Sequence, residues 1–419
     1  MTIGFIGLSH LGLVSSISAS EKGFNIIGYD DKSELIEKLN KGITELEEPN
    51  LIKIKNKNKR RIKFTNDPKN LNKCDLVYFS KDIKTNKKNV SDFKSINSLI
   101  NKVKKHLNKR STLIMLSQIT PGFTRKIKWP KDKLYYQVET LIFGKAIKRS
   151  LSPERIIVGK ANETVKINLK YMKFLKKFNC PILTMNYESA ELTKIAINLF
   201  LISSIVTSNK LSEISSNLGA NYNKIQSALK LDKRIGRFAY LNPGLGIAGG
   251  NLERDLINII KISKKHHIDK KLFDSWNDNS NFMKEWAYRK FKRVNKKNII
   301  TKISILGITY KENTNSIKNS PAIELINKLR KYKVNIYDPV VKINFTKKNL
   351  INKNSISECL KDFDVLFIMT PWKKFKNYNF KKIFKKMKSV NIIDPYGVIN
   401  DDNLTHKNLN YYSITKTIN

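Results

Sequence analysis

Short apolar segments that alternate with helical segments constrain the fold of this chain more than any other feature. In the first part of the sequence, buried strands are expected at 2–7, 24–30, 75–79 and 111–116. The alternation restarts near Lys297, with further buried strands expected at 302–307, 334–338, 364–369 and 390–394. Strands that alternate with helices are typical of a parallel sheet covered by helices. The sequence therefore predicts an α/β protein with two Rossmann-like, doubly wound parallel-sheet domains.

A long helical pattern separates the two alternating regions. Apolar residues recur at helical spacing from Glu188 to about Leu218, and Gly219 supplies a stop. A helix this long joins domains or forms a dimer seam more readily than it fits inside one sheet domain. We therefore expect a first sheet domain over 1–185, a central helical domain over 186–295, and a second sheet domain over 296–419.

The formal net charge of +45 in 419 residues is the unusual feature of the composition. The lysines are scattered along the chain, whereas nucleic-acid binders tend to concentrate charge in a stripe or tail with recognisable motifs. The sequence shows no zinc-finger spacing, no aromatic RNA-binding signature and no basic tail. We favour solvated lysine-rich faces that attract anionic small molecules, and we expect no nucleic-acid partner. Charge-driven nucleic-acid binding is kept as a third interpretation.

The three cysteines, Cys74, Cys180 and Cys359, lie far apart and form no CxxC pair. This usage fits a reduced cytosolic protein and gives no sign of a metal site. The N-terminus shows no charged-then-apolar leader, and no stretch reaches about 18 uncharged apolar residues. We therefore expect a cytoplasmic protein without a membrane partner.

A glycine-containing turn follows the first expected strand. It reads Gly7-Leu-Ser-His-Leu-Gly12, with serine where the usual fingerprint has its middle glycine, and Asp30 ends the second strand. Backbone amides at such a helix start can hold a diphosphate, and the acid can bind ribose hydroxyls and disfavour NADP. The alternative is that the glycines serve packing alone. We favour NAD binding, with contacts from Gly7, Ser9, His10, Leu11, Gly12 and Asp30.

Several further segments match the motifs of one known family, in that family's order. They are Leu39-Asn-Lys-Gly42 with Glu48-Pro49, Ser152-Pro-Glu-Arg-Ile-Ile-Val-Gly159, Glu191-Leu-Thr-Lys194 with Asn198, Arg234-Ile-Gly236, Pro243-Gly-Leu-Gly246, Leu306-Gly-Ile-Thr-Tyr-Lys311 through Thr314 to Ser320-Pro321, and Thr370-Pro-Trp-Lys-Lys-Phe375. With these segments the chain resembles the UDP-glucose/GDP-mannose dehydrogenase family across nearly its whole length.

The resemblance implies a two-step oxidation of a nucleotide sugar. In the family a primary alcohol gives one hydride to NAD, a cysteine adds to the aldehyde, a second hydride leaves, and the thioester is hydrolysed to the acid. A thiolate suits this role because it is a strong nucleophile and a workable leaving group. The resemblance also implies that 296–419 binds the nucleotide sugar, that the central helix forms a homodimer, and that the product serves polysaccharide synthesis.

The chain departs from the family at the position of that cysteine. The family's loop reads Gly-Gly-Ser-Cys, three residues, then Asp, whereas this chain has Ala248-Gly-Gly-Asn251-Leu-Glu-Arg-Asp255. Asn251 therefore stands in the nucleophile position, and a carboxamide nitrogen cannot do the work of a thiolate. The family's lysine before the aspartate is Arg254, which keeps the charge but cannot transfer a proton.

Four other family positions are also altered. Gln118 replaces a threonine, and Phe143 replaces the second of two glutamates, of which Glu139 remains. In the last domain Lys318 replaces the arginine of Arg-Glu-Ser-Pro, and Tyr396 replaces that of Asp-x-Arg. The last-domain changes affect which nucleotide sugar fits.

The remaining residues define a candidate site, with roles that the resemblance implies. The candidate catalytic residues are Lys194, Asn198, Asp255, Glu139 and Asn251; Gln118 and Lys311 join the cofactor contacts; the candidate substrate contacts are Arg234, Gly246, Gly249, Gly250 and Lys318; no metal is expected. Lys194 and Asn198 are four apart and share one helix face, where they can hold a water or a sugar hydroxyl.

Four of these residues also have a structural alternative. Lys194 can be one more surface lysine, Asp255 a helix-capping acid, and Arg234 part of a surface ion pair. His10 fits packing or solvent exposure better than catalysis.

The leading interpretation is an NAD-dependent oxidoreductase acting on a nucleotide sugar, most simply a UDP-sugar. It resembles a UDP-glucose 6-dehydrogenase but stops at an aldehyde or ketone because it lacks the thiol. A second oxidation through an aldehyde hydrate, with Glu139 assisting the water, is less well supported. The alternative from another class is a non-catalytic family descendant that binds NAD or a nucleotide sugar.

Overall fold

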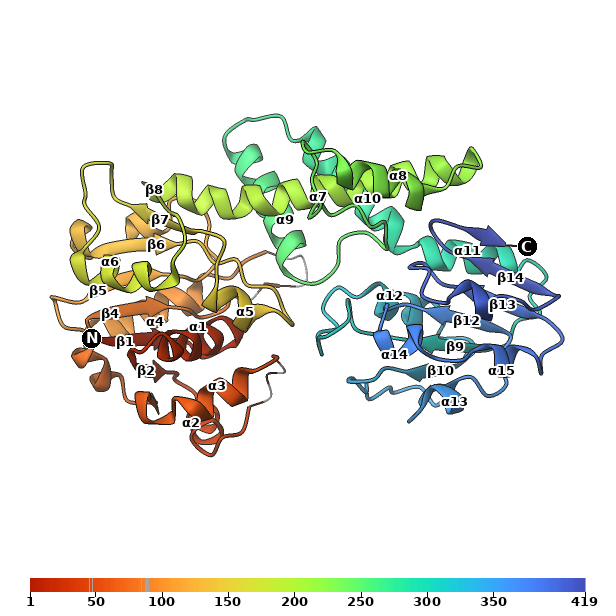
Figure 1. The fold of residues 1–419 in the computed structure, drawn as a ribbon, viewed down its shortest axis with the longest axis horizontal. Coiled ribbons are helices and arrows are strands. Elements are labelled where there is room, and N and C mark those ends of the chain that lie inside the picture. The colour runs from red at the N-terminus through yellow and green to blue at the C-terminus, as the bar shows by residue number, and fades with distance from the viewer. Residues whose placement is uncertain (45, 47, 84, 87–89, 419) are drawn as a thin grey trace. The chain divides into compact units, whose positions relative to one another are not determined.

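A computed structural model describes residues 1–419 except 45, 47, 84, 87–89 and 419. The chain forms two compact units, Met1–Ile197 and Asn198–Asn419 (Figure 1). Each unit is built around one mostly parallel sheet, which confirms the predicted fold class.

The sheet of the first unit has eight strands among the described residues, in the order β3-β2-β1-β4-β5-β6-β7-β8. They are β1 (Thr2–Ile6), β2 (Asn25–Tyr29), β3 (Ile62–Thr65), β4 (Leu76–Phe79), β5 (Thr112–Met115), β6 (Leu134–Gln137), β7 (Ile156–Lys160) and β8 (Ile182–Asn186). Neighbouring strands are parallel except β6 and β7. The strand order reverses between β1 and β4, and open α/β sheets bind ligands beyond the carboxyl ends of their strands at such a point.

Helices cover this sheet. They are α1 (His10–Glu21), α2 (Ser33–Asn40), α3 (Leu51–Lys57), α4 (Lys94–Lys104), α5 (Ala146–Leu151) and α6 (Leu169–Leu175). In α4 the buried residues are Ile96, Leu99, Ile100 and Val103, the spacing of one apolar helix face. Strands β4 and β5 are buried along their whole length, as expected for central strands of a covered parallel sheet.

The long helix predicted from Glu188 to about Leu218 is confirmed as α7 (Tyr187–Asn217, 31 residues). The boundary between the two units falls within this helix, after Ile197. Among the described residues α7 is one helix long and apolar enough to cross a membrane by length and composition, with 33% of its 18-residue window buried. A helix in the core of a soluble protein can have the same length and composition.

The sheet of the second unit has seven strands in the described part of the chain, in the order β11-β10-β9-β12-β13-β14-β15. They are β9 (Lys302–Leu306), β10 (Lys333–Tyr337), β11 (Leu350–Asn352), β12 (Val365–Ile368), β13 (Val390–Ile393), β14 (Leu409–Tyr412) and β15 (Thr417–Ile418). Only the last pair is antiparallel within the described residues. From β11 to β14 this order repeats that of β3 to β6, so each unit has its own switch point.

The second unit also contains the helices that precede and cover this sheet. They are the end of α7 with α8 (Tyr222–Leu231), α9 (Asn251–Lys265), α10 (Lys271–Lys284), α11 (Trp286–Val294), α12 (Pro321–Lys328), α13 (Ile356–Cys359), α14 (Lys373–Lys376) and α15 (Lys381–Phe384). A small core of Ile202, Ile247 and Leu256 joins α7 to α9 and to the loop before α9.

Candidate functional site

The turn between β1 and α1 requires glycine at both ends of the motif. Gly7 has φ +89°, and a Cβ there would lie 2.6 Å from Cβ of Lys81. At Gly12 a Cβ would lie 1.8 Å from the carbonyl oxygen of Gly7. Ser9 fits at the middle position, where its hydroxyl accepts a hydrogen bond from the backbone N–H of Asp82 (3.2 Å). The helix start therefore lies tight against the strand, as a diphosphate site needs.

Asp30 follows β2 and lies beside this turn. Its Oδ2 accepts a hydrogen bond from the backbone N–H of Leu8 (2.8 Å), and its Oδ1 accepts one from Lys32 (3.2 Å). Burial, with a smaller contribution from Asp31, raises the pKa of the Asp30 carboxyl. The acid thus fixes the turn and stands at the end of β2, where ribose hydroxyls are bound in this fold.

His10, the first residue of α1, is held from two sides. Its Nε2 lies 2.9 Å from Oε1 of Glu48, and its ring stacks on Phe143 with centroids 3.9 Å apart. Glu48 also accepts backbone hydrogen bonds from Gly144 (2.8 Å) and Ala146 (3.2 Å). These contacts lower the pKa of Glu48 although its burial alone would raise it. His10 thus packs between Glu48 and Phe143, and Phe143 occupies the position where the family has a glutamate.

The loop after β5, which carries Gln118, is anchored to α7 by a residue that the sequence did not single out as functional. The buried carboxylate of Glu191 accepts hydrogen bonds from the backbone N–H groups of Gly122 (2.6 Å) and Thr124 (2.9 Å). Burial raises the pKa of Glu191. The family resemblance assigned a role to its motif neighbour Lys194, whereas nothing in the local sequence indicates what Glu191 binds.

Lys194 is buried rather than one more surface lysine. Its Nζ lies 3.5 Å from Oε2 of Glu139, and the two side chains are only 8% and 13% exposed. Glu139 also accepts a short hydrogen bond from the backbone N–H of Leu141. The structure thus brings together two of the five candidate catalytic residues in the first unit.

In the second unit Asn198 and Asp255 form a direct buried contact. Nδ2 of Asn198 donates to Oδ2 of Asp255 across 2.5 Å. Nε of Arg254 lies 3.4 Å from the other carboxylate oxygen, and Asp255 is 1% exposed. Asp255 is the fifth residue of α9 and lies beyond the helix start, so it is not the helix-capping acid considered as the alternative.

Asn251 is the first residue of α9 and is exposed. Its Oδ1 accepts a hydrogen bond from Nη2 of Arg254 (3.2 Å). Because a guanidinium has only donors, the amide oxygen must face Arg254, which leaves Nδ2 as the group that can donate to a ligand.

The glycine loop before α9 packs against two neighbours. Gly249 has φ +83°, and a Cβ there would lie 2.7 Å from the ring of Tyr310. A Cβ on Gly246 would lie 2.4 Å from the carbonyl oxygen of Ser280, and one on Gly250 would lie 3.1 Å from Cδ of Lys318. Side chains at these positions would push the loop away from α10 and from the loop after β9.

The loop after β9 contains the same kind of hydrogen bond, from a backbone N–H to an aspartate, as the loop after β1. The backbone N–H of Ile308 donates to Oδ2 of Asp338 across 2.8 Å, as that of Leu8 does to Asp30. Lys311 and Lys318 belong to this loop. The pKa of Lys318 is lowered by desolvation and by the neighbouring charge of Arg254. The second sheet therefore also has a nucleotide-type turn, with cationic side chains beside it.

Arg234 and Cys359 make contacts with residues outside the glycine loop before α9. Arg234 is 89% exposed and pairs with Asp232 (2.6 Å), a surface contact that raises the pKa of Arg234. Cys359, in the same unit, is buried at the second sheet, with Sγ 3.5 Å from the carbonyl oxygen of Asn335. Burial raises the pKa of this thiol to about 12. Within the described part of the second unit, no thiol takes the place of the family's cysteine.

The described residues contain no group of three or more histidine, cysteine, aspartate or glutamate side chains placed to hold a metal ion.

Two sheets with this strand order, and a glycine turn with an acid after the second strand, define a nucleotide-binding α/β protein of the Rossmann type. Family models match three consecutive parts of the chain: the NAD binding domain over 1–176, the central domain over 188–281 and the UDP binding domain over 304–401. The chain therefore belongs to the UDP-glucose/GDP-mannose dehydrogenase family.

Individual relatives agree with this assignment. The UDP-glucose 6-dehydrogenase of Rickettsia prowazekii is 29% identical over 448 residues, with 100% of both chains covered. The UDP-glucose 6-dehydrogenase TuaD of Bacillus subtilis is 25% identical over 429 residues, covering 98% of this chain and 92% of the relative. The family resemblance seen in the motifs is thus confirmed, and with it NAD as the cofactor.

Solved structures share the fold. A UDP-glucose dehydrogenase from Pyrobaculum islandicum matches with a TM-score of 0.86 at 19% identity, covering 99% of this chain and 97% of the other. A UDP-D-ManNAc dehydrogenase from Pyrococcus horikoshii matches with a TM-score of 0.86 at 23% identity, covering 99% of each chain. At these identities the likeness establishes the architecture and not the substrate.

Proposed function

We propose that this chain oxidises a CH–OH group of a nucleotide sugar with NAD, in the manner of a UDP-glucose 6-dehydrogenase, and removes one hydride per sugar. The observation that carries the proposal is Asn251 at the start of α9, with its oxygen turned to Arg254. The remaining amide N–H can hold a substrate oxygen but cannot add to an aldehyde carbon. The covalent step that leads to an acid is therefore missing.

The reaction converts R–CH2OH and NAD+ into R–CHO, NADH and a proton; NAD, when bound, supplies the hydride acceptor. The ammonium of Lys194, held by Glu139, stabilises the developing alkoxide. Asn198 binds a water or a sugar hydroxyl, and the contact with Asp255 fixes the orientation of its amide. Asp255 also balances the charge of Arg254.

The first sheet supplies the cofactor site. The tight turn from Gly7 to Gly12 leaves no room for side chains at either glycine, and such a turn offers backbone amides to a diphosphate. Leu11 is buried, so we assign it a backbone contact alone. Asp30 takes the ribose hydroxyls and repels the extra phosphate of NADP. Gln118 and Lys311 remain proposed cofactor contacts.

The substrate is proposed to be a UDP-sugar. The names of the relatives and the family's UDP binding domain over 304–401 support this class. We assign Gly246, Gly249, Gly250 and Lys318 to the sugar nucleotide because they surround the start of α9. Arg234 remains a proposed substrate contact. It would bind the substrate only after its ion pair with Asp232 breaks, or it would bind the substrate of the partner subunit in a dimer.

We also propose a cytoplasmic homodimer with the three-part division at 185 and 295. Several apolar side chains of the second unit's helical part are exposed: Phe200, Leu218, Leu231 and Phe238. The three cysteines are free thiols, as in a reducing compartment. Light scattering should give twice the chain mass of 48.5 kDa, and a value of one chain mass would contradict the dimer.

The alternative is a non-catalytic protein that binds NAD and a nucleotide sugar. The replaced cysteine and Phe143 favour it, since both remove groups that the family uses. The buried pairs Lys194–Glu139 and Asn198–Asp255 oppose it, because a binding protein has no need of them.

The deciding experiment is to incubate the purified chain with NAD and a panel of UDP-, GDP- and TDP-sugars, and to count NADH formed per sugar consumed. One NADH per sugar, with an aldehyde or ketone as product, supports the proposal. Two would show that the acid is reached without the thiol, through a hydrate. No NADH despite measurable binding of NAD and a sugar would establish the non-catalytic alternative.

A further inference from the structure

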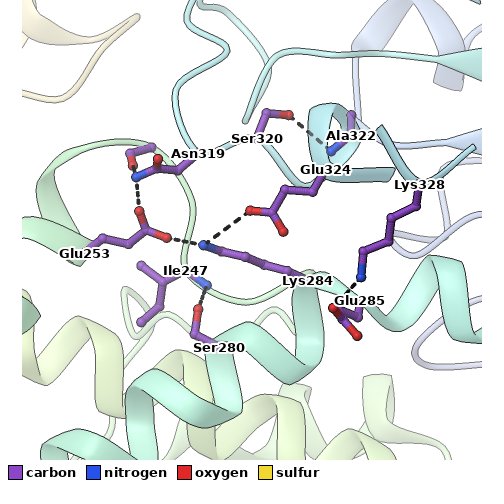
Figure 2. A network of polar contacts seen from close by, with 11 residues as sticks. Ile247, Glu253, Ser280, Lys284, Glu285, Asn319, Ser320, Ala322, Glu324 and Lys328 are labelled. Atoms are coloured by element: carbon purple, nitrogen blue, oxygen red, sulfur yellow. Dashed lines mark hydrogen bonds and ion pairs between the residues drawn. The ribbon is translucent and has the colours of Figure 1, made fainter. Parts of the chain in front are cut away.

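A buried charge network lies beside the glycine loop in the second unit (Figure 2). Its members come from distant parts of the sequence: Glu253 from α9, Lys284 from the end of α10, Glu324 from α12, and Asn319 from the loop after β9. Figure 2 shows Lys284 extended between Glu253 and Glu324, with Asn319 on the far side of Glu253. The network thus connects the central helices with the sheet domain of the same unit.

Asn319 binds the glycine loop directly. Its Nδ2 donates to the carbonyl oxygen of Gly249 (2.9 Å) and, by a short hydrogen bond, to the carboxylate of Glu253. Both partners are acceptors, so the amide nitrogen must face them. Asn319 has φ +51°, a conformation that asparagine adopts more readily than most residues. Two hydrogen bonds therefore hold its side chain against the glycine loop.

Glu253 and Lys284 form the buried base of this contact. Their side chains are 9% and 8% exposed, and they are joined by a short ion pair. Burial raises the pKa of Glu253, and the charge of Lys284 acts in the opposite direction. A buried carboxylate needs a cation to stay charged, and Lys284 provides it.

The end of the glycine loop next to Asn251 has no side chains of its own with which to make contacts. Gly249 and Gly250 have no side chains, and Asn251, which follows them, carries the amide that the proposed function assigns to the substrate oxygen. The network fixes Gly249 on one side of Asn251 and Glu253 on the other. The position of Asn251 therefore depends on residues to which the proposed function assigns no substrate contact.

We propose that Asn319, supported by the Glu253–Lys284 ion pair, is a positioning residue that holds Asn251 in place for the oxidation. The role assigned to Asn251 rests on the proposed function. The loop that contains Lys311 and Lys318 thereby sets the position of the reacting end of the sugar. The competing interpretation is a buried ion pair that only stabilises the unit.

The test uses Asn319→Gly in the full-length chain, because glycine tolerates φ +51° and removes only the amide. Asn298→Gly is the matched control, since Asn298 also has φ +51° and is exposed in the same unit. Hydrogen exchange of residues 246–251 reports on the loop, and NADH formation with a UDP-sugar reports on the reaction. Glu253→Gln, which keeps an acceptor for Asn319, serves as a second variant.

Asn319→Gly should speed exchange in 246–251 roughly tenfold, whereas Asn298→Gly should leave it unchanged. It should lower kcat roughly tenfold with KM for NAD unaltered, and the loss should vanish in an Asn251→Ala background. Glu253→Gln should show a smaller change in the same direction. Unchanged exchange in 246–251, or equal losses of kcat with and without Asn251, would overturn the proposal. If the wild-type chain forms no NADH, the proposed function fails, and the exchange result alone decides whether Asn319 holds the loop.

Discussion

The side-chain amide of Asn198 donates a hydrogen bond to Oδ2 of Asp255 across 2.5 Å, and this contact joins α7 to the second turn of α9. Both residues are buried, at 6% and 1% exposure, in a place where an unpaired carboxylate would be costly. The amide therefore gives this buried carboxylate a hydrogen-bond partner beside Arg254.

Asn198→Asp should place two carboxylates in this contact. One of them will have a raised pKa, so the stability of the variant should be lost as pH rises; at neutral pH we expect a cost of about 3 kcal/mol. Urea unfolding at about pH 5.5 and about pH 8 measures the difference. Asn217→Asp, exposed at the end of α7, is the control. Equal destabilisation at both pH values would show that the two carboxyl groups do not affect each other's ionisation.

Asp30→Asn should weaken the preference for NAD. The amide oxygen can still accept the hydrogen bond from the N–H of Leu8, so the turn is kept, while the negative charge that repels a ribose phosphate is lost. We expect KM for NAD to rise roughly tenfold and activity with NADP to become measurable. Steady-state kinetics with both cofactors tests this, with Asp31→Asn as control. If the ratio of kcat/KM with NAD to kcat/KM with NADP is unchanged, Asp30 does not determine the choice of cofactor.

Asn251→Cys should restore the missing nucleophile. The residue begins α9, and a helix N-terminus lowers the pKa of a cysteine thiol. The ratio of NADH formed to sugar consumed should then change from one to two, with an acid as product. Mass spectrometry of the product gives an independent reading. If the variant still yields one NADH and an aldehyde, the altered neighbours, and not the lost thiol alone, prevent the second oxidation.

Asp394 should make the protein less stable as pH rises from about 4 to about 6. It is fully buried, accepts hydrogen bonds from the N–H of Ile399 (2.9 Å) and the hydroxyl of Tyr411 (3.0 Å), and burial raises its pKa to about 6. The folded state thus favours the protonated acid. Protonated Asp394 contributes fully to the stability of the fold below the pKa that it has in the unfolded chain, and this contribution is lost as the acid ionises. The total loss in the free energy of unfolding is about 3 kcal/mol.

Asp394→Asn should abolish this pH dependence and be more stable than the wild type near neutral pH. Urea unfolding at several pH values between about 4 and about 8 measures it. Asp362→Asn is the control, because Asp362 is exposed and Lys302 lowers its pKa. A wild-type stability that does not fall between about pH 4 and about pH 6 would show that Asp394 ionises without penalty.

Much of the fold could be predicted because its determinants are local. Buried central strands such as β4 and β12 are continuous apolar runs, and α7 has a long helical repeat. The strands β3, β6 to β8, β11, β14 and β15 were not predicted. Short strands such as Leu134–Gln137 are not distinguished by their local pattern from other apolar segments, and pairing with neighbours decides them.

The candidate site was predicted only in part. Motif spacing indicated Lys194, Asn198 and Asp255, but their partners come from residues far away in the sequence. The stacking of Phe143 on His10 also has no local signature. The sequence shows that the family's glutamate is replaced at Phe143, whereas the contact that Phe143 makes with His10 is seen only in the tertiary structure.

The sequence by itself determined the two α/β units, the glycine turns and the absence of a cysteine at position 251. These depend on residue type and on short-range spacing: the turn at Gly7, for example, excludes a side chain. Only the tertiary structure decided which buried charges meet. Glu253, Lys284 and Asn319 come from three separate elements. Their association depends on how helices and loops pack, because a buried charge is stable only where the fold brings a partner to it.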